Sequence, residues 1–244
     1  MTAERWARVV REQVSLGRLL PLGVARDGAW IAESAAETVL RGAADGVPGV
    51  RLGALRIALS DPDNGGTPAV PPPPSALPPG PLRLSADFAA HAAEPLPTTA
   101  SRLRTALAAA ATDGVGLTVT EVDLHVTGLW DEEPGPRDPG SERAPERNAP
   151  QPAQTGDDET RVAAAALAVP GVSRLTGTLG GLGRAVHIED GPTPTPSLPR
   201  RHVRVELAVR SPHQPLKVTR EVRTAVTASL PDTPTVTIVV TATD

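Results

Sequence analysis

The sequence predicts an α+β protein made of two tandem α-β-β-α-β modules, each a small mixed sheet with its helices on one face. Three observations lead to this expectation. Short apolar patterns recur in the same order in both halves, strand-like alternation gives way to helix-like periodicity in each half, and a charged, proline-rich stretch separates the halves. We expect an N-terminal amphipathic helix and connector over residues 1–29, a first module over 30–130, a disordered linker over 131–156 and a second module over 157–244.

The repeat consists of four pairs of short segments. Residues 47–50 return as 169–172, 82–84 as 203–205, 103–107 as 222–226 and 118–120 as 235–237. Each half then reads as helix, strand, strand, helix, strand. Each half ends in the order strand, helix, strand, which is typical of a crossover connection. The last two strands of each half should therefore be parallel. Whether the halves pack as an intramolecular pseudo-dimer or behave as two independent beads stays open.

The N-terminal segment should form an amphipathic helix over residues 4–20. Trp6, Val9, Val10, Leu16 and Leu20 fall on one broad face at helical spacing. This helix either packs on the first module or binds a partner or a membrane surface.

The first module should begin with a helix from Trp30 to about Gly46, followed by a strand over residues 50–60 in which Gly53 marks a bulge. Residues 60–81 form a proline-rich loop that is expected to be extended. A strand over 81–90, a helix opened by Pro95 and Pro97, and a strand over 117–128 complete the module.

The second module should begin with a helix capped by Asp157 and Asp158. Residues 175–188 are expected to form a hairpin that turns at Gly180, Gly181 and Gly183. Another proline loop follows over 190–199. A strand over 202–210 should place Arg204, Glu206 and Arg210 outward, before a helix over 215–230 and a final strand over 235–243.

Bulk composition excludes several protein classes. The chain has no cysteine, so it holds no disulfide or zinc–thiolate site. No run of eighteen apolar residues is present, and the first 20 residues lack the apolar stretch of a signal peptide. A net charge of −4 gives no strong nucleic-acid signal. We therefore expect a cytoplasmic protein, free or peripheral at the inner face of the membrane.

The pattern resembles the alkaline shock protein family, the general-stress and cell-envelope proteins of Gram-positive bacteria. The residues that carry the resemblance lie in both halves. They are Ala35, Ala36, Glu37, Val39 and the step at 47–50 in the first half, and Val162, Ala166, the step at 169–172, the strand at 203–209, Val222, Arg223, Val226 and the last strand in the second. Lys217 is the only lysine among 24 basic residues, which is typical of a GC-rich genome such as that of an actinobacterium. The resemblance implies a non-catalytic, self-associating protein without a cofactor, which in some members gathers at the membrane through a membrane-anchored partner.

The residues themselves show no catalytic, cofactor-binding or metal-binding motif. The five histidines are His91, His125, His187, His202 and His213, and none has the spacing of a zinc protease. His125 and His202 should lie on outward strand faces. Residues 61–66 lack the ligand order of a calcium loop, and residues 177–183 lack the helix and lysine of a phosphate loop. We interpret both as turns.

These observations favour a non-enzymatic structural or interaction protein that binds itself or a membrane-anchored protein. The alternative is a cytosolic nucleic-acid or small-molecule binding module, in which Arg204, Arg210, Arg220 and Arg223 form a basic stripe. An enzyme would need a pocket between the halves. The linker is expected to be a solvated tether, with an interaction segment as its alternative.

Overall fold

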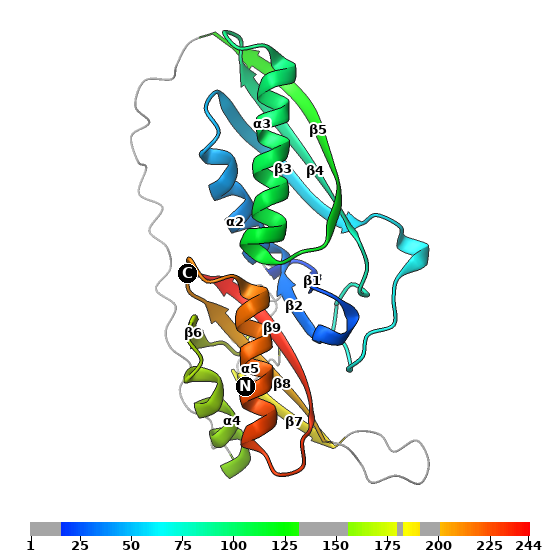
Figure 1. The fold of residues 1–244 in the computed structure, drawn as a ribbon, viewed down its shortest axis with the longest axis vertical. Coiled ribbons are helices and arrows are strands. Elements are labelled where there is room, and N and C mark those ends of the chain that lie inside the picture. Colours follow the sequence, from blue (N-terminus) through cyan, green and yellow to red (C-terminus); the bar gives the residue numbers. More distant parts are fainter. Residues whose placement is uncertain (1–15, 132–155, 180–182, 191–200) are drawn as a thin grey trace, which may run out of the picture.

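The computed structural model describes residues 16–131, 156–179, 183–190 and 201–244, and it confirms the α+β class. The described residues form two mixed sheets that lie end to end along the long axis of the molecule (Figure 1). Most of the predicted linker and the second proline loop lie outside the described residues.

The smaller sheet has three strands, in the order β3 (Val50–Leu59), β4 (Leu82–His91) and β5 (Val119–Trp130). β4 is antiparallel to β3 and parallel to β5, because the helix α3 (Leu96–Ala109) carries the chain across between β4 and β5. A short π-helical segment (Ala110–Val115) continues α3. The helices α2 (Glu33–Asp45) and α3 cover one face (Figure 1), where alternate residues of β4 are buried.

The predicted bulge at Gly53 is confirmed. The register between β3 and β4 shifts between Leu52 and Leu55, which leaves Gly53 opposite Asp87. A Cβ atom on Gly53 would lie 3.3 Å from the Asp87 backbone oxygen, so the close approach of the two strands favours glycine here.

The larger sheet has six strands. They are β1 (Leu19–Leu22), β2 (Ala29–Ala32), β6 (Val172–Leu175), β7 (Val186–Asp190), β8 (Arg201–Val209) and β9 (Thr235–Thr243). Its order is β1-β2-β9-β8-β6, and β7 also pairs with β8. The helix α5 (Pro215–Ser229) connects β8 to β9, which are parallel, and α4 (Asp157–Leu167) packs beside α5 (Figure 1).

The N-terminal helix prediction was wrong at its C-terminal end. Leu19 and Leu20 lie in β1, and Trp30, expected to begin a helix, lies in β2. Both four-residue segments are wholly buried, and β2 adds to the larger sheet in parallel with β9. Two short apolar strands bury their side chains on both faces, which removes the alternation that would identify them. Residues 4–15 lie outside the described residues.

The hairpin prediction over residues 175–188 was also wrong. β6 and β7 do not pair with each other, and both are antiparallel to β8. Leu175 pairs with Leu207 and Val186 pairs with Val205, so the two strands are parts of one edge strand that is interrupted opposite Glu206. Residues 177–179 leave the sheet at that interruption, and residues 180–182 lie outside the described ranges.

The same backbone hydrogen bonds occur at the ends of both sheets. His91 N donates to Gly49 O at 2.9 Å in the smaller sheet, and Arg210 N donates to Gly171 O at 2.8 Å in the larger one. Both glycines have a positive φ, which L side chains rarely adopt. The next residues repeat the match, since Ala92 N donates to Trp130 O and Ser211 N donates to Asp244 O.

The strand pairing gives a different alignment of the two halves at two of the four pairs of segments matched in the sequence. Ala90 pairs with Val50 and Val209 pairs with Val172, so β4 and β8 align with Leu84 at the position of Val203. The sequence match of residues 82–84 with 203–205 is therefore displaced by two residues. Leu84 and Val203 pair in turn with Val122 and Val236, which displaces the match of 118–120 with 235–237 as well.

The proline-rich loop over residues 60–81 runs from the smaller sheet to the edge of the larger one. Leu19 N donates to Ser75 O, and Leu77 N donates to Leu19 O at 2.8 Å, so the loop lies beside β1. Trp30 Nε1 donates to Leu77 O and Thr237 Oγ1 donates to Pro71 O. The buried apolar side chains of both sheets belong to one core cluster, so the two sheets pack together within the chain.

Candidate functional site

The smaller sheet has an open edge along β5. Among the described residues, β5 pairs with β4 on one side and with no strand on the other, although it is 12 residues long. The corresponding strand of the larger sheet, β9, is flanked by both β8 and β2. Long open edges invite pairing with another chain, which makes β5 the first candidate for an interaction site.

Apolar side chains are more exposed next to the open edge of β5 than at the paired strand β9. Val126 is 44% exposed on β5, whereas Val240, at the equivalent position of β9, is fully buried. Leu129 is 62% exposed near the end of β5. The position of Val126 is therefore accessible in the first half, whereas the equivalent position in the second half is covered.

Backbone groups of β5 point to the open side at alternate residues. Ile238 N on β9 donates to Gly28 O on the β2 side at 3.0 Å, and pairing places Leu124 at the same position of β5. Arg104 Nε on α3 donates to Val122 O at 3.3 Å, which places that carbonyl on the open side as well. Since strand residues alternate in direction, Val122, Leu124 and Val126 all present backbone N–H and C=O groups at this edge.

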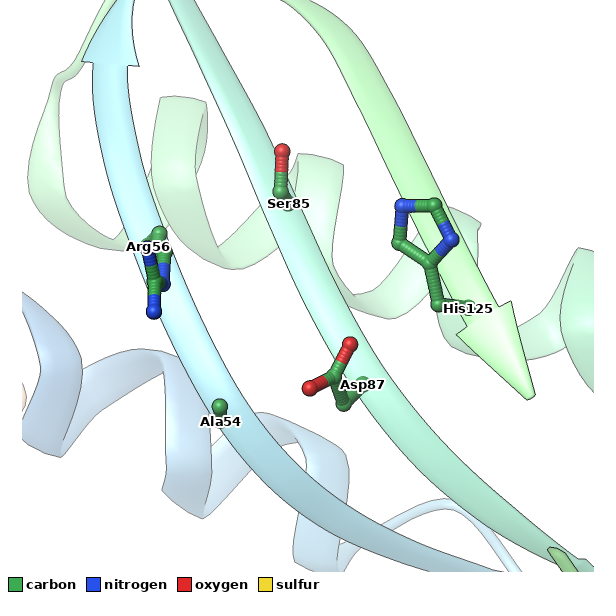
Figure 2. Close-up of a pocket in the computed structure, with 5 residues that line it drawn as sticks. All are labelled: Ala54, Arg56, Ser85, Asp87 and His125. Carbon is green, nitrogen blue, oxygen red and sulfur yellow. The ribbon is translucent and has the colours of Figure 1, made fainter. Parts of the chain in front are cut away.

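A polar face lies next to the edge, on the side of the smaller sheet away from α2 and α3. Arg56, Ser85, Asp87 and His125, with Ala54, line a shallow hollow across three strands (Figure 2). His125 is exposed, as predicted. Within the described part of the chain, no hydrogen bond joins Ser85, Asp87 and His125, so these residue types form no nucleophile–base pair there.

Ion pairs and ring contacts hold β5 against its neighbours on this face. Arg83 on β4 bonds to the Glu121 carboxylate at 2.6 Å and lies 3.6 Å from that of Asp123. At the end of the strand, the Arg51 guanidinium carbon lies 4.2 Å from the centre of the Trp130 ring, within cation–π range. These contacts fix the strand without covering its outer edge.

A second candidate is the buried carboxylate of Glu206, which the alternation of residues 202–210 predicted to face outward. Glu206 is fully buried because residues 176–179 fold over the sheet at the interruption between β6 and β7. Its Oε2 atom accepts hydrogen bonds from Thr178 N at 2.8 Å and Leu179 N at 2.9 Å. The alternation of the strand was predicted correctly, but nothing in the pattern showed that this part of the outer face is covered.

The other carboxylate oxygen of Glu206 faces two basic groups at longer distance. His187 Nε2 lies 3.8 Å and Arg204 Nε lies 3.9 Å from Oε1, and among the described residues neither Oε1 nor Arg204 Nε has a hydrogen-bond partner. Burial raises the pKa of Glu206 to about 7, although Leu179 N–H, Arg204 and Thr178 oppose the shift. Burial and Arg204 lower the pKa of His187. One oxygen of the Glu206 carboxylate is therefore hydrogen-bonded, and the half-buried His187 and Arg204 lie near the other oxygen without bonding to it.

The five histidines are not brought together. His202, predicted to face outward, is 8% exposed, and its Nδ1 lies 2.9 Å from Thr235 Oγ1. Burial lowers the pKa of His202. His213 Nδ1 lies 3.2 Å from Arg210 O in the turn before α5. No group of three or more potential metal ligands occurs within the described ranges.

The proposed basic stripe is not formed. Arg220 on α5 makes two bonds to the Asp27 carboxylate, at 2.9 and 3.0 Å, and Arg223 donates to Arg26 O. Arg204 lies on β8, on the opposite side of the sheet from α5, beside Glu206. The arginines that were expected to face a ligand together are divided between two faces, and two of them connect α5 to the segment between β1 and β2.

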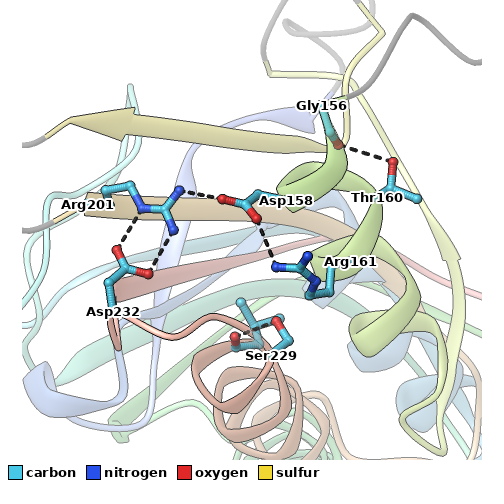
Figure 3. Close-up of polar contacts among 8 residues, drawn as sticks. Gly156, Asp158, Thr160, Arg161, Arg201, Ser229 and Asp232 are labelled. Atoms are coloured by element: carbon cyan, nitrogen blue, oxygen red, sulfur yellow. Dashed lines mark hydrogen bonds and ion pairs between the residues drawn. The ribbon is translucent and has the colours of Figure 1, made fainter.

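Another ion-pair network anchors the start of α4 (Figure 3). Arg201 bonds to both oxygens of Asp232, at 2.6 and 2.7 Å, and to Asp158 at 2.7 Å. Asp158 also accepts from Arg161 one turn later. The network joins β8, α4 and the loop before β9, and we assign it a structural role.

The two turns considered from the sequence differ in outcome. Residues 61–66 form an exposed turn, in which the Asp61 side chain accepts from Asp63 N, as predicted. Residues 177–179 instead contribute the N–H groups that bind Glu206, and residues 180–182 lie outside the described ranges.

No family model, curated protein or solved structure matches this chain. In the part of the chain that the structure describes, no helix has the length and apolar character needed to cross a membrane.

Proposed function

We propose that this chain is a non-enzymatic assembly protein, built from two diverged copies of one α-β-β-α-β module. In this proposal the second copy is completed by β1 and β2 of the same chain. The first copy keeps the equivalent edge open for an interaction.

The tandem arrangement is supported by equivalent contacts in both halves. Each sheet has an antiparallel pair followed by a parallel crossover, and the bond from His91 N to Gly49 O corresponds to that from Arg210 N to Gly171 O. Asp87 and Glu206 occupy the same position, opposite an irregularity of the neighbouring edge strand. Such detailed agreement is expected of two copies with a common origin.

The observation that carries the functional proposal is the difference between β5 and β9. β9 is paired on both sides, whereas β5 exposes Val126 and Leu129 beside an open edge. Exposed apolar residues next to unpaired backbone groups are the features through which strands add to a sheet.

The biological setting rests on the sequence resemblance to the alkaline shock protein family. We propose a role in envelope or general stress homeostasis, in the cytoplasm or at the inner face of the membrane. Membrane association would then depend on a membrane-anchored partner.

A photo-crosslinking amino acid tests whether the β5 edge is used. It would replace Thr127, exposed on β5, in one full-length variant and Thr224, exposed on α5, in a matched control. In the native cell we expect protein adducts from position 127 and few from position 224. Equal yields, or no adduct from 127, would refute the proposal that β5 is the interaction site.

A further inference from the structure

We infer that the occupant of the β5 edge is the β5 strand of a second copy of this chain, paired antiparallel about a two-fold axis. This inference rests on the proposed function and names its partner. The two smaller sheets would then join into one continuous six-stranded sheet.

Side-chain complementarity selects the register of this pairing. With Leu124 opposite the partner's Leu124, Val122 lies opposite the partner's Val126, so apolar residues meet on the helix-covered side. On the polar face, Asp123 lies opposite the partner's His125, and the two-fold axis forms this pair twice. The strand is therefore complementary to itself in both side-chain rows.

Backbone geometry fits the same register. Val122, Leu124 and Val126 present their N–H and C=O groups to the open side, because Ile238 N, at the position of Leu124, donates to the β2 side, and Val122 O accepts from Arg104 there. In an antiparallel pair these residues face each other as hydrogen-bonded pairs, and Asp123 and His125 occupy the non-hydrogen-bonded positions, where side chains approach more closely. Arg104 would release Val122 O to the incoming strand.

The nearest alternative registers are less favourable. A shift by two residues in one direction places Asp123 against the partner's Asp123, and the two carboxylates repel each other. A shift by two residues in the other direction places His125 against the partner's His125 and Asp123 against the partner's Thr127, so both Asp123–His125 pairs are lost. A two-fold interface also closes on itself, so the pairing of β5 with β5 gives a dimer rather than a filament. The edge of β9 cannot compete, because β2 already occupies it.

Charge variants of the full chain test both the partner and the register by sedimentation equilibrium. Asp123→Lys places a cation opposite the partner's His125, and we expect it to weaken dimerisation by about tenfold because two pairs are lost at once. The double variant Asp123→Lys with His125→Glu again places a carboxylate opposite a basic side chain in both pairs and should recover most of the affinity. Glu121→Lys is the matched control, because in this register Glu121 lies toward the partner's Thr127, at an irregularity of β5, and opposite no charged residue. Glu121 also shares Arg83 with Asp123, so both variants disturb the contacts of Arg83.

A single cysteine gives a second measurement that does not depend on affinity. The chain has no native cysteine, so Leu124→Cys should form a disulfide-linked dimer under mild oxidation, since the two residues meet at the axis. Thr120→Cys should not, because residue 120 faces the partner's Gly128. If the full chain dimerises and the Asp123→Lys variant dimerises with the same affinity, the proposed register is wrong. Equal disulfide crosslinking of Leu124→Cys and Thr120→Cys would overturn the register as well.

A full chain that remains monomeric at all concentrations would overturn the inference of a second copy. If position 127 still gave photo-crosslinks to a different protein, the proposed function would stand while this inference failed. If the full chain stayed monomeric and position 127 gave no photo-crosslink, both the proposed function and this inference would fail.

Discussion

Arg220 holds the buried carboxylate of Asp27 with two hydrogen bonds across a separation of 193 residues. Asp27 also accepts from Val24 N at 2.8 Å, so the pair fixes the segment that joins β1 to β2 against α5. β2 in turn covers the edge of β9. The ion pair thus maintains the structural difference between the two sheet edges.

Arg220→Met should destabilise the chain by about 2 kcal/mol, because it leaves the Asp27 carboxylate buried with the Val24 N–H as its main remaining donor. This value is below the usual cost of a broken buried pair because the Arg220 side chain is 48% exposed. Urea unfolding would measure it, with Arg210→Met as the exposed control.

The same pair predicts a dependence on pH. Burial alone would raise the pKa of Asp27, but the bonds from Arg220 and Val24 N outweigh it and hold the pKa below its usual value. The stabilisation is therefore present above about pH 4 and is lost as the pH falls through the lower, folded-state pKa. The difference between wild type and Arg220→Met should shrink in acid, and a constant difference would contradict this explanation.

Glu206→Gln should show a pH dependence of opposite sign. Burial raises the pKa of Glu206 from 4.5 to about 7, so the folded wild-type protein loses stability as the pH rises across that window. The shift corresponds to about 3 kcal/mol. We therefore expect the glutamine variant to gain stability relative to wild type between pH 4.5 and 8, as followed by urea unfolding.

Asp87→Asn is the matched control for this measurement, because Asp87 occupies the equivalent position in the smaller sheet and is half-buried. Parallel stability curves for wild type and Glu206→Gln across the whole pH range would show that the buried carboxylate does not titrate during unfolding.

The two equivalent glycines should differ in their tolerance of alanine. Both have a left-handed φ, which costs alanine about 1 kcal/mol. A Cβ atom on Gly171 would also lie 2.8 Å from His213 Cγ and from Val218 Cγ2, whereas one on Gly49 would be 3.4 Å from its nearest neighbour. We expect Gly171→Ala to cost about 3 kcal/mol and Gly49→Ala about 1 kcal/mol in chemical denaturation. Equal costs would argue against the described packing around Gly171.

Arg201→Met should lower the free energy of unfolding by about 1 kcal/mol, because its ion pairs are only partly shielded from solvent. Amide hydrogen exchange should quicken in the first turn of α4, which Asp158 anchors. Arg161→Met, which leaves Arg201 with both of its partners, serves as the control. An unchanged amide exchange rate in the first turn of α4 in Arg201→Met would show that the contact between Arg201 and Asp158 does not hold this turn in place.

The sequence predicted the long elements well and the short ones poorly. β3, β4, β5, β8 and β9 are nine or more residues long, which leaves room for a recognisable stretch of alternation in each, and α5 follows helical spacing across its length. β1 and β2 have four buried residues each, so neither period could develop within them.

The remaining differences between the predicted and the observed structure arise from contacts between segments that lie far apart in the sequence. Glu206 and His202 alternate correctly with the apolar residues of β8, but both are buried. Residues 176–179 cover Glu206, and His202 contacts Thr235 on β9. The open edge of β5 could not be predicted either, because an edge is defined by which strands fail to pair. The difference between β5 and β9 depends on β2, which lies more than 200 residues from β9 in the sequence.

The most direct test of edge assembly is the amide hydrogen exchange of Leu124 in the full chain, measured at low and at high protein concentration. We predict rapid exchange in dilute solution and strong protection in concentrated solution, because a second β5 strand would then accept its N–H. The equivalent amide of Ile238, which already donates to Gly28 O, should be protected at both concentrations. Rapid exchange of Leu124 at every concentration would contradict assembly through the β5 edge.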